Sequence, residues 1–259
     1  MDNQKLLLLD GHSILSRAFY GIPDLTNAEG LHTNAVYGFL NILFKVLDEE
    51  KADSLAVAFD LKAPTFRHKM YDAYKGTRKP MPAELHEQVP VMKEVLSAMG
   101  VPILTKEGYE AYDILGTIAF QAERMGREVS ILSGDRDLLQ LATDRIQIRI
   151  PKTKRTGTEV EDYYAGDVLE KYQVTPTQFI DVKALMGDAS DNIPGIPGVG
   201  EKTATKIIVQ FGSIENAHEH LEEITPKKAR ESLRDHYDLA VLSKKLATIN
   251  TGSPVEFDP

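Results

Sequence analysis

Short apolar segments of this chain repeatedly end at an acidic residue. Four apolar residues directly precede each of Asp10 and Asp60, and a mostly apolar run ends shortly before Asp135. Continuous apolar runs of this length are typical of strands that are buried on both faces of a parallel sheet. Because the carboxyl ends of parallel strands meet at one edge, where open α/β folds place their sites, the pattern predicts that these acids come together there.

Strands and helices alternate along roughly the first two-thirds of the chain. Strands are expected over residues 5–10, 54–60, 101–105, 128–133 and 146–150, and helices over 12–20, 34–50, 111–125 and 137–142. The segment 34–50 is the clearest helix, because its apolar residues recur at helical spacing. This βαβ alternation predicts an α/β fold with a mostly parallel central sheet and helices on its faces.

The pattern changes to helices separated by turns from about Tyr164 onward. Helices are expected over residues 167–172, 176–186, 202–211, 214–220 and 227–249. We therefore expect an α/β core over 1–163 and a helical region over 164–259. A polar, basic, proline-broken stretch from Tyr71 to Leu85 indicates a mobile excursion between two core elements, and such loops often carry function.

Composition is that of an ordinary soluble globular protein, with 42% hydrophobic and 27% charged residues. The absence of cysteine excludes disulfides and thiolate metal sites and suits a reducing compartment. No leader or membrane-spanning run is recognisable, so a cytoplasmic location and no membrane partner are expected.

The net charge of −9 argues at first against nucleic acid, but basic clusters at 67–69, 75–79 and 202–206 could follow a phosphate backbone. Taken alone, each cluster is better explained as an exposed lysine-rich surface.

Eight carboxylates in five clusters are the candidate metal ligands. So many acids at one sheet edge would repel one another unless cations neutralised them, and carboxylates are the ligands that Mg²⁺ prefers. The pattern therefore predicts a magnesium site, with two ions rather than one. Any one of these acids alone would be better explained as a helix cap, since Asp is common at that position. The eight are Asp10, Asp60, Glu110, Asp113, Asp135, Asp137, Asp188 and Asp191.

A glycine-rich stretch at 193–200 nearly matches a phosphate-binding P-loop. The match fails because Glu201 separates Gly200 from Lys202, and because no apolar strand precedes the loop. A helix–hairpin–helix explains it better, since Gly195, Gly198 and Gly200 would let backbone N–H groups approach a DNA phosphate. Lys202 and Thr203 would add contacts at the start of the following helix. A plain structural turn remains the alternative.

Taken in order, these motifs resemble the 5′ nuclease domain of bacterial DNA polymerase I and the related flap endonucleases. The likeness runs from end to end, and although each motif is weak, the ordered set is specific. It rests on Leu9-Asp10-Gly11-His12, Phe59-Asp60, Ala63-Pro64-Thr65-Phe66-Arg67-His68, Tyr74-Lys75-Gly76-Thr77-Arg78, Gly108-Tyr109-Glu110-Ala111, Asp135-Arg136-Asp137-Leu138, Met186-Gly187-Asp188-Ala189-Ser190-Asp191-Asn192 and Gly198-Val199-Gly200-Glu201-Lys202-Thr203-Ala204.

The resemblance implies a PIN-like nuclease core, a helical arch at about 71–99 and a helix–hairpin–helix at about 185–212. It also implies two Mg²⁺ or Mn²⁺ ions, the first served by Asp10, Asp60 and Glu110. The remaining ligands, assigned to the second ion, would be Asp135, Asp137, Asp188 and Asp191. Lys75 and Arg78 would assist the reaction at the phosphate, Arg67 and Arg17 would contact further phosphates, and a K⁺ would accompany the hairpin.

By the same resemblance, the chain is expected to be a monomeric, bacterial nucleoid-associated nuclease of replication and repair. Its substrates would be flapped or nicked duplex DNA with a 5′ single strand, and RNA primers on DNA. One position departs from the family's Glu-Ala-Asp-Asp motif, because Tyr112 replaces the first aspartate. Asp113 cannot substitute for it, since adjacent helical residues point about 100° apart. The alternatives are therefore an impaired nuclease and a cleavage-deficient DNA-structure-binding module, with an RNA-directed nuclease less favoured.

Overall fold

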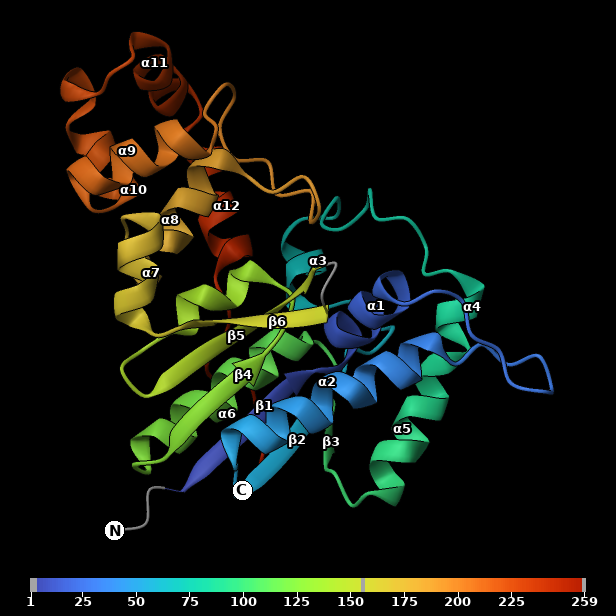
Figure 1. Ribbon diagram of the computed structural model, residues 1–259. Coiled ribbons are helices and arrows are strands. Elements are labelled where there is room, and N and C mark those ends of the chain that lie inside the picture. Colours follow the sequence, from blue (N-terminus) through green and yellow to red (C-terminus); the bar gives the residue numbers. More distant parts are fainter. Residues whose placement is uncertain (1–3, 155–156, 258–259) are drawn as a thin grey trace.

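A six-stranded sheet in the order β3-β2-β1-β4-β5-β6 forms the centre of the molecule (Figure 1). The computed structural model describes residues 4–154 and 157–257. Strands β1 to β5 are parallel and β6 is antiparallel to β5, which confirms the prediction of a mostly parallel sheet. The strands are β1 (Lys5–Asp10), β2 (Ser54–Ala58), β3 (Ile103–Leu104), β4 (Glu128–Leu132), β5 (Ile146–Lys154) and β6 (Gly157–Tyr163).

Helices cover both faces of this sheet. Leu7 and Leu9 of β1 pack with α1 (Gly11–Gly21), α2 (Asn34–Glu50) and α5 (Gln88–Ala98). Leu6 and Leu8 point to the other face, where α6 (Ala111–Arg124) lies. Successive side chains of a strand point to opposite faces, so the run of four leucines is buried on both sides. The same layering places Asp10, the residue after these leucines, at the carboxyl edge of the sheet.

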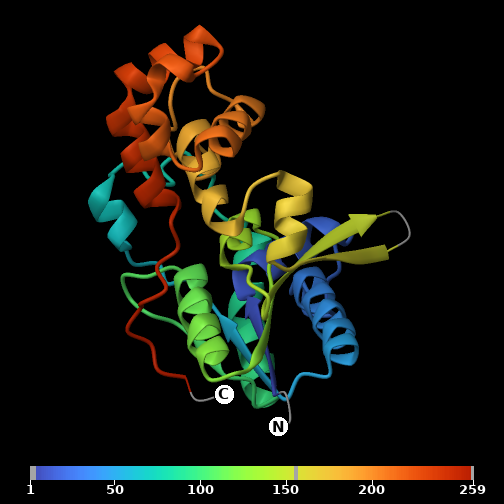
Figure 2. The same cartoon turned by 90° about the vertical axis from the view of Figure 1, so that its left-hand side faces the viewer.

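About the last third of the chain, from residue 165, is a helical region beyond that edge, most of it at the top of Figure 1. After α12 the chain runs back along α6 (Figure 2), where the Asn250 N–H donates to Asp113 at 2.8 Å and the Ser253 N–H to Thr117 at 3.0 Å. The helices are α7 (Ala165–Tyr172), α8 (Pro176–Met186), α9 (Glu201–Phe211), α10 (Ile214–Glu219), α11 (Lys227–Asp235) and α12 (Tyr237–Ala247), with a short 3₁₀ turn, η2 (Leu221–Glu223).

Some elements differ from those expected. The strand β6 is an antiparallel partner of β5 that its polar sequence did not suggest. The helix expected at 227–249 is broken at His236, whose backbone (φ −127°, ψ 27°) is not helical and separates α11 from α12. The segment expected at 137–142 is a 3₁₀ helix, η1 (Arg136–Leu141). Within the predicted arch, α4 (Ala83–His86) and α5 follow an irregular loop, and α5 buries Met92 and Leu96 in the core; α3 (Phe66–Met70) precedes that loop.

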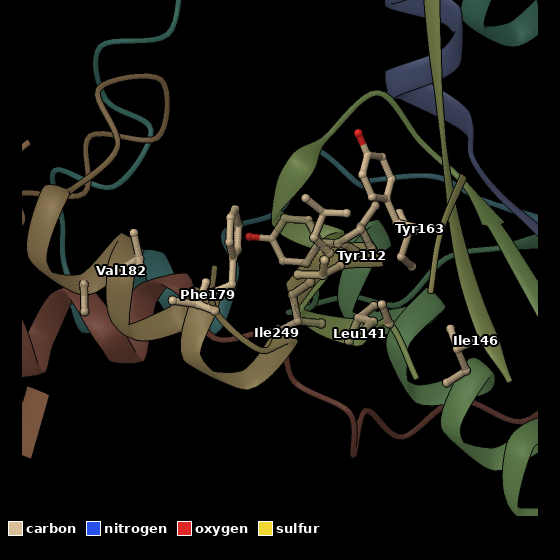
Figure 3. Close-up of a cluster of buried hydrophobic side chains, with 14 of the residues drawn as sticks. Tyr112, Leu141, Ile146, Tyr163, Phe179, Val182 and Ile249 are labelled. Atoms are coloured by element: carbon tan, nitrogen blue, oxygen red, sulfur yellow. The ribbon is translucent and has the colours of Figure 1, made fainter. Parts of the chain in front are cut away.

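One continuous apolar cluster joins the sheet region to the helical region (Figure 3). It includes Tyr112 of α6, Leu141 of η1 and Phe179 and Val182 of α8. Because these side chains share one core, the acids of the sheet edge and the loop after α8 are held in a fixed relation. In the described part of the chain, no helix is long and apolar enough to span a membrane.

Candidate active site and nucleic-acid interface

Three carboxylates at the ends of strands line a single pocket of about 740 Å³. Asp10 is the N-cap of α1 and accepts a hydrogen bond from the Ser13 N–H at 3.1 Å. Asp60, two residues after β2, accepts one from the Ala111 N–H at 2.8 Å. Asp135 follows β4 and caps η1. A capping carboxylate keeps a second oxygen for other partners. The caps seen here therefore do not exclude a role of the same residues as metal ligands.

These three acids lie close enough to affect one another. Burial, together with the neighbouring carboxylates of Asp60 and Asp135, raises the pKa of Asp10 to about 7. Within the described residues no lysine or arginine forms an ion pair with any of the three, and only His12 lies 3.7 Å from Asp60. An all-oxygen donor set with uncompensated negative charge fits a hard divalent cation such as Mg²⁺.

The carboxylates of Asp10, Asp60 and Asp135 are not arranged around a common point. Over residues 4–154 and 157–257 no group of three or more His, Cys, Asp or Glu side chains is arranged so that it could hold a metal ion. Binding an ion in this pocket therefore requires Asp10, Asp60 and Asp135 to move toward one another. Asp60 has the most freedom to do so, since its side chain is 43% exposed.

Basic side chains line the same pocket. Lys93 of α5 lies 4.8 Å from the centre of the Phe59 ring, and Lys62 lies 3.0 Å from the Nε2 of His86. Cations beside the acids could neutralise the phosphates of a bound strand. The basic residues that line the pocket are Lys62, Lys75, Arg78, Lys79 and Lys93.

Glu110 and Asp191 are instead held in hydrogen bonds and ion pairs. Glu110 pairs with Lys75 and Asp191 with Arg78. The Tyr112 hydroxyl donates to Glu110 at 2.5 Å and lies 2.8 Å from the Tyr74 hydroxyl. Burial alone would raise the pKa of Glu110, but Lys75 and then Arg67 beside it bring that pKa below its ordinary value. Glu110 is therefore a stable carboxylate that already has its counter-charges.

Asp113 and Arg67 lie outside the pocket, in the core. Nη1 and Nη2 of Arg67 donate to the two oxygens of Asp113 at 2.8 and 2.9 Å, and neither side chain is exposed. The other donors of Arg67 bond Glu110 at 2.7 Å and the carbonyl oxygens of Leu246 and Thr248 at 2.8 and 2.7 Å. All five guanidinium N–H groups are thus used. In this arrangement Arg67 has no donor left for a phosphate and Asp113 has no free oxygen for a metal, so the roles expected of them would require these bonds to be broken.

Asp137 and Asp188 share Lys183, a residue that the sequence did not single out. The Nζ of Lys183 lies 2.8 Å from Asp137 and 2.5 Å from Asp188, and its side chain is only 10% exposed. Burial and the neighbouring Asp135 raise the pKa of Asp137 to about 7, against the opposing effect of Lys183. Lys183 therefore neutralises part of the charge expected to attract a second ion. Its position in the otherwise apolar turn Val182-Lys183-Ala184-Leu185 was the available signal.

The loop between α8 and α9 makes a tight hairpin. Gly187 and Gly195 both have positive φ values, and a Cβ on Gly195 would lie 2.4 Å from the backbone nitrogen of Gly187. Such close approach of two backbones excludes any side chain there. Gly198 makes a second turn at φ +73°, beside the exposed Lys228 of α11.

The remaining DNA-binding candidates lie on two different elements. Lys202 and Thr203 stand in the first turn of α9, which begins after Gly200, and Lys202 is exposed. Arg17 of α1 lines a separate pocket of about 360 Å³ that it shares with Lys45 of α2. The Nε of Arg17 is buried without a hydrogen-bond partner. Of the sequence-predicted residues, Asp10, Asp60, Asp135, Lys75 and Arg78 thus line one pocket, the hairpin residues lie on another segment, and Arg17 lines a separate groove. The other predicted acids and Arg67 are held in ion pairs outside the pocket lining.

Two family profiles cover the chain. Residues 5–173 match the family described as "5'-3' exonuclease, N-terminal resolvase-like domain", and residues 174–259 match "5'-3' exonuclease, C-terminal SAM fold". Among curated proteins, the chain is 50% identical over 253 residues to DNA polymerase I of Bacillus caldotenax, and 50% identical over 255 residues to that of Bacillus subtilis. Each alignment covers 98% of this chain but 29% of the relative. The chain thus spans less than a third of their length.

Solved structures share its fold. A bacteriophage T5 5'-exonuclease with bound divalent metal ions (zinc) is 25% identical, with a TM-score of 0.77 over 96% of this chain and 90% of that one. The catalytic core of Rad2 in complex with DNA substrate is 18% identical, with a TM-score of 0.62 over 99% of this chain and 81% of that one, and shows the fold alone. The nuclease core with a C-terminal helical region, predicted from the sequence, is confirmed.

Proposed function

Because this chain belongs to the 5′–3′ exonuclease family, we propose that it is a metal-dependent, structure-specific 5′ nuclease. Its substrates would be duplex DNA that carries a 5′ single strand, at flaps or nicks, and RNA primers on DNA. The T5 relatives support the proposal, since one is described with divalent metal ions and another as a flap endonuclease complex with DNA and metal ions.

A single observation carries this proposal: one pocket is lined both by three carboxylates, Asp10, Asp60 and Asp135, and by five cationic side chains. A scissile phosphodiester in this pocket would meet a bound metal ion at the acids and would also lie within reach of the basic side chains. A divalent ion bound there would activate a water molecule and stabilise the charge of the transition state. Asp10, Asp60 and Asp135 would hold it.

Lys75 and Arg78 would act on the reacting phosphate. In the absence of DNA, Lys75 pairs with Glu110 and Arg78 with Asp191, and the Arg78 side chain is still half exposed. Both side chains line the pocket, so they can exchange a carboxylate for a phosphate oxygen without a change of fold. A contact that strengthens as charge develops lowers the barrier rather than only binding the substrate.

The hairpin after α8 would hold the duplex away from the reacting centre. Backbone N–H groups at Gly198 and Gly200 and the start of α9 suit a phosphate, whereas the Gly195 N–H already donates to the Ser243 hydroxyl at 2.9 Å. Lys202 and Thr203 would add side-chain contacts, and Arg17 would contact a further phosphate beside α1. The K⁺ expected at this hairpin from the resemblance also stays a prediction.

A second candidate function is a DNA-structure-binding module with little cleavage. The observation that favours it is the place of Tyr112, whose ring lines the pocket and whose hydroxyl bonds Glu110. The binding surfaces would be unaffected, whereas the chemical step would lose a carboxylate. The affinity of such a module for branched DNA would equal that of an active nuclease.

The test is cleavage of a 5′-flap substrate in Mg²⁺, set against binding of the same substrate in Ca²⁺. A blunt duplex of the same sequence is the matched control substrate, and Asp60→Asn is the control variant. Cleavage of the flap alone, lost in Asp60→Asn, supports a structure-specific nuclease. Binding with no detectable cleavage supports the binding module, and failure to bind the flap more tightly than the blunt duplex removes both candidates.

A further inference from the structure

Two phenols join the carboxylates of Glu110 and Asp191, although these lie 81 positions apart in the sequence. The hydroxyl of Tyr74 lies 3.1 Å from Oε2 of Glu110 and 3.2 Å from Oδ2 of Asp191. The hydroxyl of Tyr112 bonds Glu110 and Tyr74, as described above. Both rings are buried, and each O–H replaces a contact with water that the carboxylates have lost. The pair thus holds the two acids together without an ion.

The charges around this pair already cancel. Three carboxylates, Glu110, Asp113 and Asp191, stand against three cations, which are Arg67, Lys75 and Arg78. Adding a divalent cation to this balanced and mostly buried group would leave an excess of two positive charges. Such an excess is strongly unfavourable where water is excluded. An aspartate at position 112 would reverse the balance, because four carboxylates would then face three cations.

The acids of the pocket beside it are held differently. Within the described residues, no lysine or arginine forms an ion pair with Asp10, Asp60 or Asp135. A divalent ion would therefore meet carboxylates there that no cation already holds, whereas Glu110 and Asp191 are held by Lys75 and Arg78. The Tyr112 ring also lines this pocket, so it stands between the two groups. Its surroundings keep it there, since the guanidinium carbon of Arg67 lies 4.8 Å from its ring centre.

We infer that this chain takes up one divalent metal ion, at Asp10, Asp60 and Asp135, and that the Tyr74–Tyr112 pair holds Glu110 and Asp191 together so that neither of these two carboxylates coordinates an ion. The inference rests on the proposed function, from which we take the expectation that the ligand is a divalent metal ion. It departs from the two-ion expectation that came from the resemblance. Tyr74 and Tyr112 are positioning residues here, because they act through the carboxylates that they hold.

The test is the number of Mn²⁺ ions bound per molecule of the metal-free full chain, measured by titration calorimetry and by the electron paramagnetic resonance signal of free Mn²⁺. The unaltered chain should bind one ion, and Asp60→Asn should lower the affinity for that ion by at least tenfold. Tyr112→Asp should bind two. Tyr112→Phe is the matched control, since it removes the hydroxyl without adding a carboxylate, and should still bind one.

Two ions in the unaltered chain, no ion at all, or an unchanged count in Tyr112→Asp would each overturn the inference. If Tyr112→Asp does not fold, Tyr112→Glu serves in its place, and the count for the unaltered chain decides alone. Flap cleavage by the same samples separates this inference from the proposed function. If the unaltered chain binds one ion but does not cleave the flap, the inference stands and the proposed nuclease function fails. If it binds two ions and cleaves the flap, the nuclease function stands and the inference fails.

Discussion

Arg67 and Asp113 form a bidentate ion pair in which neither side chain is exposed to solvent. The pair links α3 to the first turn of α6, and Arg67 also bonds two carbonyl oxygens at the end of α12 and just after it. A buried charge that loses its partner is left uncompensated in a low-dielectric environment, which is costly. The pair is therefore a structural tie between the nuclease core and the returning C-terminal segment.

Arg67→Ala should lower the free energy of unfolding by about 3–5 kcal/mol, because it leaves Asp113 buried and unpaired. The measurement is urea-induced unfolding followed by circular dichroism. Arg78→Ala is the matched control, since Arg78 is half exposed, and its effect should stay below about 1 kcal/mol. An Arg67→Ala protein of normal stability that binds flap DNA poorly would restore Arg67 as a phosphate contact.

Lys75 and Lys202 should affect different steps of the reaction. Lys75→Ala should slow single-turnover cleavage by about 10² or more, with a small change in Kd, because its contact strengthens as charge develops. Lys202→Ala should weaken duplex binding and reduce the slope of log Kd against log salt by about 1, at an unchanged single-turnover rate. Single-turnover kinetics and binding at several salt concentrations measure both, and the reverse pattern would overturn the assignment.

The stability of the metal-free protein should fall with rising pH because of Asp10. Its pKa in the folded chain is about 7, above the value of 3.8 expected when unfolded. Between these values the folded state holds a proton that the unfolded state has released, so folding stability decreases from about pH 4 to pH 7. The ionised form is then the destabilising one, by at most about 4 kcal/mol for three pKa units.

Asp10→Asn should therefore stabilise the metal-free protein at pH 8 and have little effect at pH 4. Thermal unfolding of both proteins in EDTA across this range measures the difference. Mg²⁺ should stabilise the unaltered chain at pH 8 more than the variant. A difference that does not change with pH would show that Asp10 keeps its ordinary pKa.

The apolar patterning was enough to predict the sheet and where the acids meet it. The runs before Asp10 and Asp60 are wholly apolar and the run before Asp135 is interrupted only by Ser130, a pattern that favours buried parallel strands. Helix α2 was predicted to its exact ends because its apolar positions follow one helical face. The strand β6 was missed because a polar edge strand has no such signature and depends on β5 for its pairing.

The partners of the acids could not be predicted from the same pattern. Glu110 meets Lys75 and Tyr74, and Asp137 meets Lys183, only because separate elements fold against one another. Sequence spacing fixes neighbours within a helix or strand, but not which side chains face each other across a loop. Arg67 and Asp113 show the same limit, since nothing in the sequence separates a buried ion pair from a phosphate contact or a metal ligand.

Single-turnover cleavage of a 5′-flap substrate in Mg²⁺, by this chain and by Tyr112→Asp, tests the account most directly. The loss of one charge-stabilising group in such a site costs about 3 kcal/mol or more, so the unaltered chain should cleave slower by a factor of about 10² or more. Tyr112→Asp should also melt at a lower temperature without metal, because it adds a carboxylate to a balanced group. Equal cleavage rates for the two proteins would contradict the account, since Tyr112 would then be compatible with an ordinary active nuclease.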